Sequence, residues 1–156
     1  MTTLANSTTA TTADRRPIDV RGPRFGAAVT TVVLALTLLT IPTTLSVILL
    51  ALQTAAFALG SLVGLQAQPY GVFFRRVVRP RLAPPTEFED PAPPRFAQTV
   101  GLGFALVGLI ALLAGATTLA YVAVGFALAA AFLNAVFAYC LGCEVYLLGK
   151  RVLSRS

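Results

Sequence analysis

Four long apolar segments restrict the fold of this chain more than any other feature. They run from about residue 25 to 41, 45 to 64, 96 to 113 and 119 to 148, and no charged residue interrupts them before Glu144. A helix needs about 20 apolar residues, with a range of about 17–25, to cross the hydrocarbon core of a bilayer. We therefore expect an all-α, polytopic membrane protein with four transmembrane helices.

The composition supports a membrane protein and excludes several kinds of site. The chain is 56% hydrophobic and 12% charged, whereas a soluble domain is about 45–50% apolar and about a quarter charged. It contains no His, which excludes His-based acid–base catalysis, most zinc sites and His ligation of haem. We attribute the net charge of +6 to arginines beside an anionic lipid leaflet and expect no nucleic acid partner.

The basic residues predict the topology. All twelve precede the first apolar segment, lie between the second and third, or follow the fourth, and the connections at 42–44 and 115–118 carry none. Because Lys and Arg concentrate in cytoplasmic loops, we expect both termini and the loop at 66–95 on the cytoplasmic side of the plasma membrane. Residues 1–16 are expected to form a disordered tail and 17–153 a single integral membrane domain.

The sequence also indicates an internal duplication. Pro23-Arg24-Phe25 resembles Pro94-Arg95-Phe96, and three further motif pairs follow in the same order with offsets of 71 to 75 residues. Apolar sequences of low complexity produce chance matches, so the duplication is a hypothesis. It predicts two pseudo-repeated helical hairpins related by an axis along the membrane normal.

The loop at 66–95 has two parts. The first is expected to be a short amphipathic helix at the membrane interface, because apolar residues recur at helical spacing. These residues are Tyr70, Phe73, Phe74 and Val77. The arginines on its other faces are candidates for contact with lipid or a partner, and they are Arg75, Arg76 and Arg79. Pro80 should end this helix. The second part, 83–94, is rich in proline and acidic residues and is expected to be a stiff linker, or alternatively a docking strip for a soluble partner.

The chain's two cysteines, Cys140 and Cys143, have C-x-x-C spacing, and Glu144 follows them. If the last helix continues to residue 148, all three share one face near the cytoplasmic end of that helix. Three interpretations remain open: two small buried residues, a redox-active dithiol, or half of a Cu(I) or Zn site that needs ligands from another chain. A helix C-terminus and a neighbouring carboxylate both disfavour thiolate, unless an arginine from 75–81 neutralises Glu144.

These motifs, in this order, resemble an uncharacterised bacterial membrane family, domain of unknown function 4395, over about residues 17–151. The resemblance rests on the paired Pro-Arg-Phe, on Gln68-Pro69, on the acidic proline-rich loop and on Cys-Leu-Gly-Cys-Glu-Val-Tyr. It implies no established activity. Members of that family are often encoded near thioredoxin-like or sulfurtransferase-type proteins, so the resemblance favours a thiol or sulfur role for Cys140 and Cys143.

We therefore expect a membrane thiol–disulfide or sulfur-relay protein, with Cys140 and Cys143 as reacting groups and Glu144 as a modulator. A soluble thioredoxin- or rhodanese-like protein would be its partner, docked on the loop at 66–95. The alternative is a non-enzymatic membrane anchor or subunit with structural cysteines, and a small sulfur-compound permease is a weaker third hypothesis. Enzymatic activity, a cofactor and a homo-oligomer are left open.

Reporter fusions test the predicted topology. Because every Lys and Arg falls on one side of the predicted spans, a reporter that is active only after export should be active when fused at Thr44 and inactive at Ser156. Activity at Ser156 would contradict the topology and place the cysteines on the oxidising side of the membrane, where a structural disulfide is the default.

Overall fold

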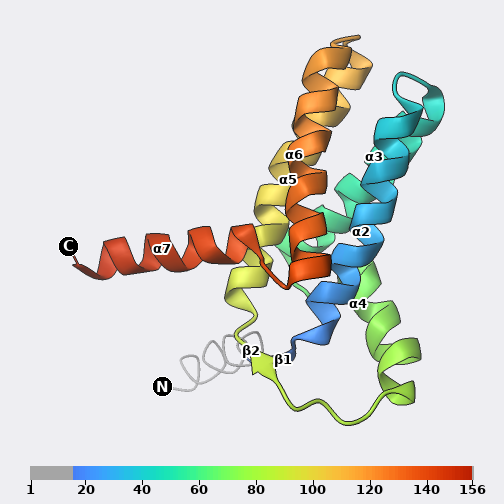
Figure 1. The fold of residues 1–156 in the computed structure, drawn as a ribbon. Coiled ribbons are helices and arrows are strands. Elements are labelled where there is room, and N and C mark those ends of the chain that lie inside the picture. Colours follow the sequence, from blue (N-terminus) through green and yellow to red (C-terminus); the bar gives the residue numbers. More distant parts are fainter. Residues whose placement is uncertain (1–15, 156) are drawn as a thin grey trace, which may run out of the picture.

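The computed structural model describes residues 16–155 and contains four long apolar helices (Figure 1). They are α2 (Arg21–Thr40), α3 (Thr44–Ala58) continued by η1 (Leu59–Val63), α5 (Ala92–Leu113) and α6 (Thr117–Phe137). Each is long and apolar enough to cross a membrane. The expected helical membrane fold with four spans is therefore confirmed. The expected disordered tail at 1–16 lies, apart from Arg16, outside the described residues.

The expected fourth span, 119–148, is wrong in its extent. α6 ends at Phe137, and a separate helix, α7 (Leu141–Arg155), begins after three intervening residues. Ala138 adopts left-handed backbone angles, with φ 55°, and the N–H groups of Ala138 and Tyr139 both donate to the Leu133 carbonyl. The chain therefore turns at the end of α6, and α7 runs across the bundle axis instead of along it (Figure 1).

The third span begins earlier than expected because prolines belong to its first turn. α5 starts at Ala92 and includes Pro93 and Pro94, which the sequence places in the linker. Proline is tolerated in a first turn because the N–H group that it lacks has no partner there. The Asp90 side chain accepts a hydrogen bond from the Ala92 N–H at 2.9 Å, which fixes the start of this helix.

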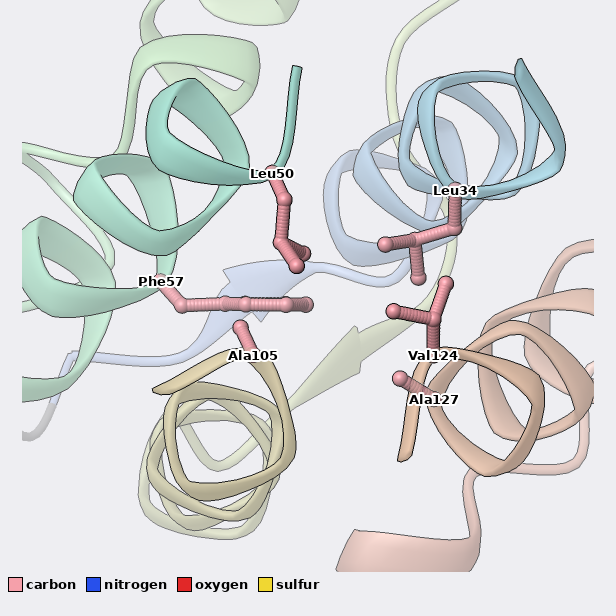
Figure 2. Close-up of a cluster of buried hydrophobic side chains, with 6 residues drawn as sticks. All are labelled: Leu34, Leu50, Phe57, Ala105, Val124 and Ala127. Carbon is pink, nitrogen blue, oxygen red and sulfur yellow. The ribbon is translucent and has the colours of Figure 1, made fainter. Parts of the chain in front are cut away.

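The four long helices stand at the corners of a square in cross-section (Figure 2). α2 packs against α3 and α6, and α5 packs against the same two helices. The core between them consists of Leu34, Leu50, Phe57, Ala105, Val124 and Ala127. Small residues allow close approach in such bundles: a Cβ added at Gly108 would lie only 3.1 Å from a Val124 methyl and 3.2 Å from a Leu50 methyl.

Two pairs of contacts correspond between the hairpins. Arg24 donates to the Ala135 carbonyl near the end of α6 at 3.4 Å, and Arg95 donates to the Ser61 carbonyl in η1 at 2.9 Å. Arg24 and Arg95 are the arginines of the two Pro-Arg-Phe motifs, so each hairpin supplies an arginine to the other. Their Phe residues behave alike, because Phe25 contacts Phe73 and Phe96 contacts Tyr146. These contacts favour the duplication, which stays a prediction.

The connection between the hairpins is more ordered than a free linker. A helical stretch formed by α4 (Pro69–Phe73), η2 (Phe74–Val78) and η3 (Arg79–Arg81) passes Pro80 before it ends. Beyond it, β2 (Phe88–Glu89) pairs antiparallel with β1 (Ile18–Asp19). An Asp19–Arg21 ion pair of 2.8 Å and a bond from Arg21 to the Ala83 carbonyl add to this junction. Part of the acidic strip is thus paired within the chain.

This connection lies at the same end of the bundle as α7, and the turns at 41–43 and 114–116 lie at the opposite end (Figure 1). This arrangement agrees with the predicted topology, in which the two short turns lie on one side of the membrane and the loop at 66–95 lies on the other. The side of the membrane that each end faces stays a prediction.

A buried polar chain joins α4 to the middle of the bundle. Gln53 is fully buried; it donates to the Thr30 hydroxyl at 3.3 Å and accepts from the Tyr70 hydroxyl at 2.8 Å. Burial raises the pKa of Tyr70, so this residue stays a protonated donor at neutral pH. The bond holds α4 against the spanning helices.

Replacement of Tyr70 by Phe should destabilise the protein by about 1–3 kcal/mol, because it leaves the Gln53 carbonyl oxygen buried without its donor. The double variant Tyr70→Phe, Gln53→Leu should recover most of that loss. The measurement is the midpoint of thermal unfolding in detergent. Tyr139→Phe is the control, since Tyr139 is 47% exposed. Additive losses in the double variant would show that the two residues do not interact.

Candidate functional site

The structure places Cys140 immediately before the first residue of α7. Its Sγ accepts a hydrogen bond from the Cys143 N–H at 3.2 Å, and its carbonyl accepts from the Glu144 N–H at 3.0 Å. A residue whose carbonyl begins a helix and whose side chain bonds the third N–H occupies the N-cap position. The first cysteine of the C-x-x-C therefore caps the N-terminus of α7.

Cys140 and Cys143 are joined as a disulfide, with their Cα atoms 5.2 Å apart. Both residues are partly buried, and α7 packs mainly against α5. The two sulfurs are thus within bonding reach of each other. Either can in turn be the atom that a thiolate from another molecule attacks.

The end of α6 overturns the expectation that both cysteines lie near a helix C-terminus. They lie instead at a helix N-terminus, where unpaired N–H groups and the positive end of the helix dipole favour a negative charge. Cysteines at helix N-termini ionise more readily than ordinary ones. The local backbone therefore favours the thiolate of Cys140, contrary to the expectation from one continuous helix.

Glu144 lies in the first turn of α7 and is exposed. The structure does not bring it together with the arginines of 75–81, because that helical stretch and α7 leave opposite sides of the bundle (Figure 1). Among residues 16–155, the ion pair is the one between Asp19 and Arg21. Glu144 lies beside the cysteine pair, but its exposure to solvent weakens any electrostatic influence on the two sulfurs.

The three arginines expected to contact lipid or a partner are all exposed, and they are Arg75, Arg76 and Arg79. Arg75 also donates to the Gln66 carbonyl at 2.7 Å. On the other side of this helical stretch, Phe74 is buried against Phe25. The segment is therefore amphipathic as expected, with its apolar side on α2. Contact of the arginines with lipid stays a prediction.

Gly142, between the two cysteines, is a feature that the sequence did not reveal. A Cβ at this position would lie 2.6 Å from the Cβ of Ala97 and 2.7 Å from its Cα. Close by, the rings of Phe96 and Tyr146 are 5.7 Å apart. The glycine thus lets the first turn of α7 lie directly on the first turns of α5. Only the tertiary structure shows this contact, because a single glycine in a sequence does not indicate what it faces.

Arg24 is a second residue that the sequence did not assign to this region. Its bond to the Ala135 carbonyl places a cation at the last turn of α6, just before the turn that leads to Cys140. A cation near a helix C-terminus is favourable. The repeated Pro-Arg-Phe motif was the signal that could have identified it.

The cysteine pair lies outside the cavity described below, and the described residues offer it no cluster of further metal ligands. Within residues 16–155, no group of three or more His, Cys, Asp or Glu side chains could hold a metal ion. A cavity of about 160 Å³ is lined by residues from the 16–18, 65–66 and 90–95 segments, and α7 contributes nothing to it. Cys140 and Cys143 are both partly exposed, so the pair lies at the surface of the protein.

Comparison with known proteins identifies the family and no activity. A family model described as "Domain of unknown function (DUF4395)" matches residues 18–151, which is most of the chain, and the protein therefore belongs to that family. No curated protein and no solved structure matches the chain.

Replacement of Gly142 by Ala should displace α7 from α5 and destabilise the protein by about 1–3 kcal/mol, because the added methyl group overlaps Ala97. The additional change Ala97→Gly should recover part of the loss. Gly149→Ala is the matched control, since Gly149 lies in the same helix and no atom lies within 4 Å of its added Cβ. Thermal unfolding in detergent measures the effect. Equal behaviour of Gly142→Ala and Gly149→Ala would contradict the close packing.

Proposed function

We propose that this member of the DUF4395 family is a membrane-embedded thiol–disulfide exchange protein. Cys140 and Cys143 would form its redox pair, and a soluble protein with a thioredoxin-like dithiol would be its partner. The observation that carries the proposal is the position of Cys140 at the N-terminus of α7, with its sulfur joined to that of Cys143. This placement favours a reactive thiolate at Cys140 and a second thiol within reach of it.

The exchange has two steps. A thiolate of the reduced partner attacks the Cys140 sulfur, the bond between Cys140 and Cys143 breaks, and Cys143 leaves as a thiolate. The partner's second thiol then attacks the partner's own sulfur in the mixed disulfide and releases the Cys140 thiolate. Two electrons and two protons pass from the partner dithiol to the pair, and the partner becomes a disulfide. The same steps in reverse oxidise the pair.

Each residue has a distinct role in this scheme. Cys140 forms the mixed disulfide, and its thiolate is stabilised by the Cys143 N–H and by the start of α7. Cys143 is the resolving cysteine. Glu144 opposes the thiolate through its like charge, although its exposure weakens that effect.

The Cys140 thiolate would also be the nucleophile if the protein relays sulfur instead of exchanging disulfides. The Cys140 thiolate would attack the terminal sulfur of a persulfide carried by a rhodanese-like partner. The partner's cysteine would leave as a thiolate, and Cys140 would become the persulfide. In both forms the sulfur that reacts with the partner is that of Cys140.

The surface at which a partner reaches the sulfurs differs from the one expected. The helical stretch 69–81 and α7 leave opposite sides of the bundle (Figure 1). We therefore place the docking surface on α7 and on the N-terminal turns of α5, not on the arginines of 75–81. The predicted topology puts this surface in the cytoplasm, where the pair would rest as a dithiol.

Trapping in cells tests the function. In Cys143→Ser the Cys140 thiolate can still attack the disulfide of an oxidised partner, but this chain lacks the second thiol that would complete the transfer, so acid quenching and non-reducing electrophoresis should recover an adduct with a thioredoxin-like protein. The matched variant Cys140→Ser should give on the order of tenfold less adduct, because Cys143 lacks the N-cap position. Absence of reducible adducts from both variants would contradict the proposal and favour a non-enzymatic anchor with structural cysteines.

A further inference from the structure

α7 carries two rows of side chains with opposite character. At 3.6 residues per turn, four apolar side chains fall on one side of the helix, and three of them are 57–62% exposed, whereas Leu147 and Leu153 lie on other sides. This apolar row consists of Leu141, Val145, Leu148 and Val152. The opposite side carries Cys143, Lys150 and Ser154, with Leu147 beside Ser154, and Glu144, Arg151 and Arg155 lie between this side and the apolar row. No other helix of the described chain covers the apolar row, because beyond its first turns α7 projects away from the bundle (Figure 1).

The contact with α5 fixes the rotation of α7 about its own axis. Gly142 lies against Ala97, and the Tyr146 ring lies against Phe96. On the helix, Gly142 and Tyr146 fall between the apolar row and the row that contains Cys143. Since α7 crosses the bundle axis (Figure 1), the two rows face opposite directions along that axis. One direction leads toward the spanning helices and the other away from them.

The depth of α7 follows from its connection to α6. α6 ends at Phe137 and α7 begins at Leu141, so only residues 138–140 separate the end of a spanning helix from the start of α7. A helix in this position lies at the boundary between hydrocarbon and water. With its apolar row toward the spanning helices, such a helix would continue the lipid-facing surface of the bundle, and its Lys and Arg side chains are long enough to reach the phosphate level.

We propose that α7 is an interfacial helix that binds the surface of the bilayer that α2, α3, α5 and α6 span. The apolar row enters the acyl chains beside the bundle. Lys150, Arg151 and Arg155 contact the phosphates of anionic lipids. Charge complementarity and continuity with the spanning helices select lipid as the occupant of this face.

The position of Cys143 follows from this binding mode. Cys143 belongs to the row opposite the apolar one, so it faces the aqueous phase at the level of the headgroups. This consequence agrees with the proposed thiol exchange, but the binding of α7 to lipid does not depend on it.

Spin labels on the full-length protein in nanodiscs of zwitterionic and anionic phospholipid test the proposal. The background is Cys140→Ser, Cys143→Ser, in which serine keeps a good N-cap for α7. Single cysteines replace Val145 and Val152 in the apolar row, and Lys150 and Ser154 in the opposite row. We expect labels at Val145 and Val152 to collide more with oxygen, which concentrates in lipid, and labels at Lys150 and Ser154 to collide more with a water-soluble nickel chelate.

Two results would overturn the proposal. Equal access of the nickel chelate to both rows would show that α7 projects into water. Low access of both reagents to the apolar row, with dipolar broadening between labels, would show that a second copy of the chain covers it. Val152→Glu provides an independent test: Val152 is 62% exposed, so the variant should fold normally. It should raise nickel access at a label on Leu148 several-fold, and an unchanged value would contradict lipid contact.

Discussion

The turn at the end of α6 determines where α7 begins and therefore where the two cysteines lie. The Leu133 carbonyl accepts hydrogen bonds from two consecutive N–H groups, and Ala138 adopts backbone angles that a non-glycine residue seldom adopts. The turn separates a membrane span from the basic helix that follows it. Without it, Cys140 and Cys143 would lie inside one long helix; with it, Cys140 caps the N-terminus of α7, a position that favours a thiolate.

The bundle holds this turn in place through contacts that cross between the hairpins. Arg24 of the first hairpin bonds the last turn of α6, and Gly142 lets α7 lie on α5. Arg95 makes the corresponding bond to η1, but the helix that follows there, α4, carries no cysteine. If the hairpins arose by duplication, α4 and α7 would be corresponding helices at the ends of the two hairpins, and of these two only α7 carries the cysteine pair.

Much of the fold could be predicted because it depends on local properties of the sequence. The length and apolarity of four segments indicate four spans, and the spacing of Tyr70, Phe73, Phe74 and Val77 indicates an amphipathic helix. The turn at Ala138 could not be predicted, because no glycine or proline marks it and the apolar pattern continues through it. The first turn of α5 was assigned to the linker because its prolines resemble a loop signal. The C-x-x-C could be identified from spacing alone, but its position on a helix depends on Ala138, and the role of Gly142 depends on Ala97.

The most direct test of the central claim is the pH dependence of Cys140 alkylation in full-length Cys143→Ser, reconstituted in nanodiscs. An N-cap position and an exposed, screened Glu144 together predict that the rate reaches half its maximum at a pH below the value of about 8.5 for an ordinary cysteine thiol. A midpoint at or above that value would contradict the account, because it would mean that the start of α7 does not stabilise the Cys140 thiolate.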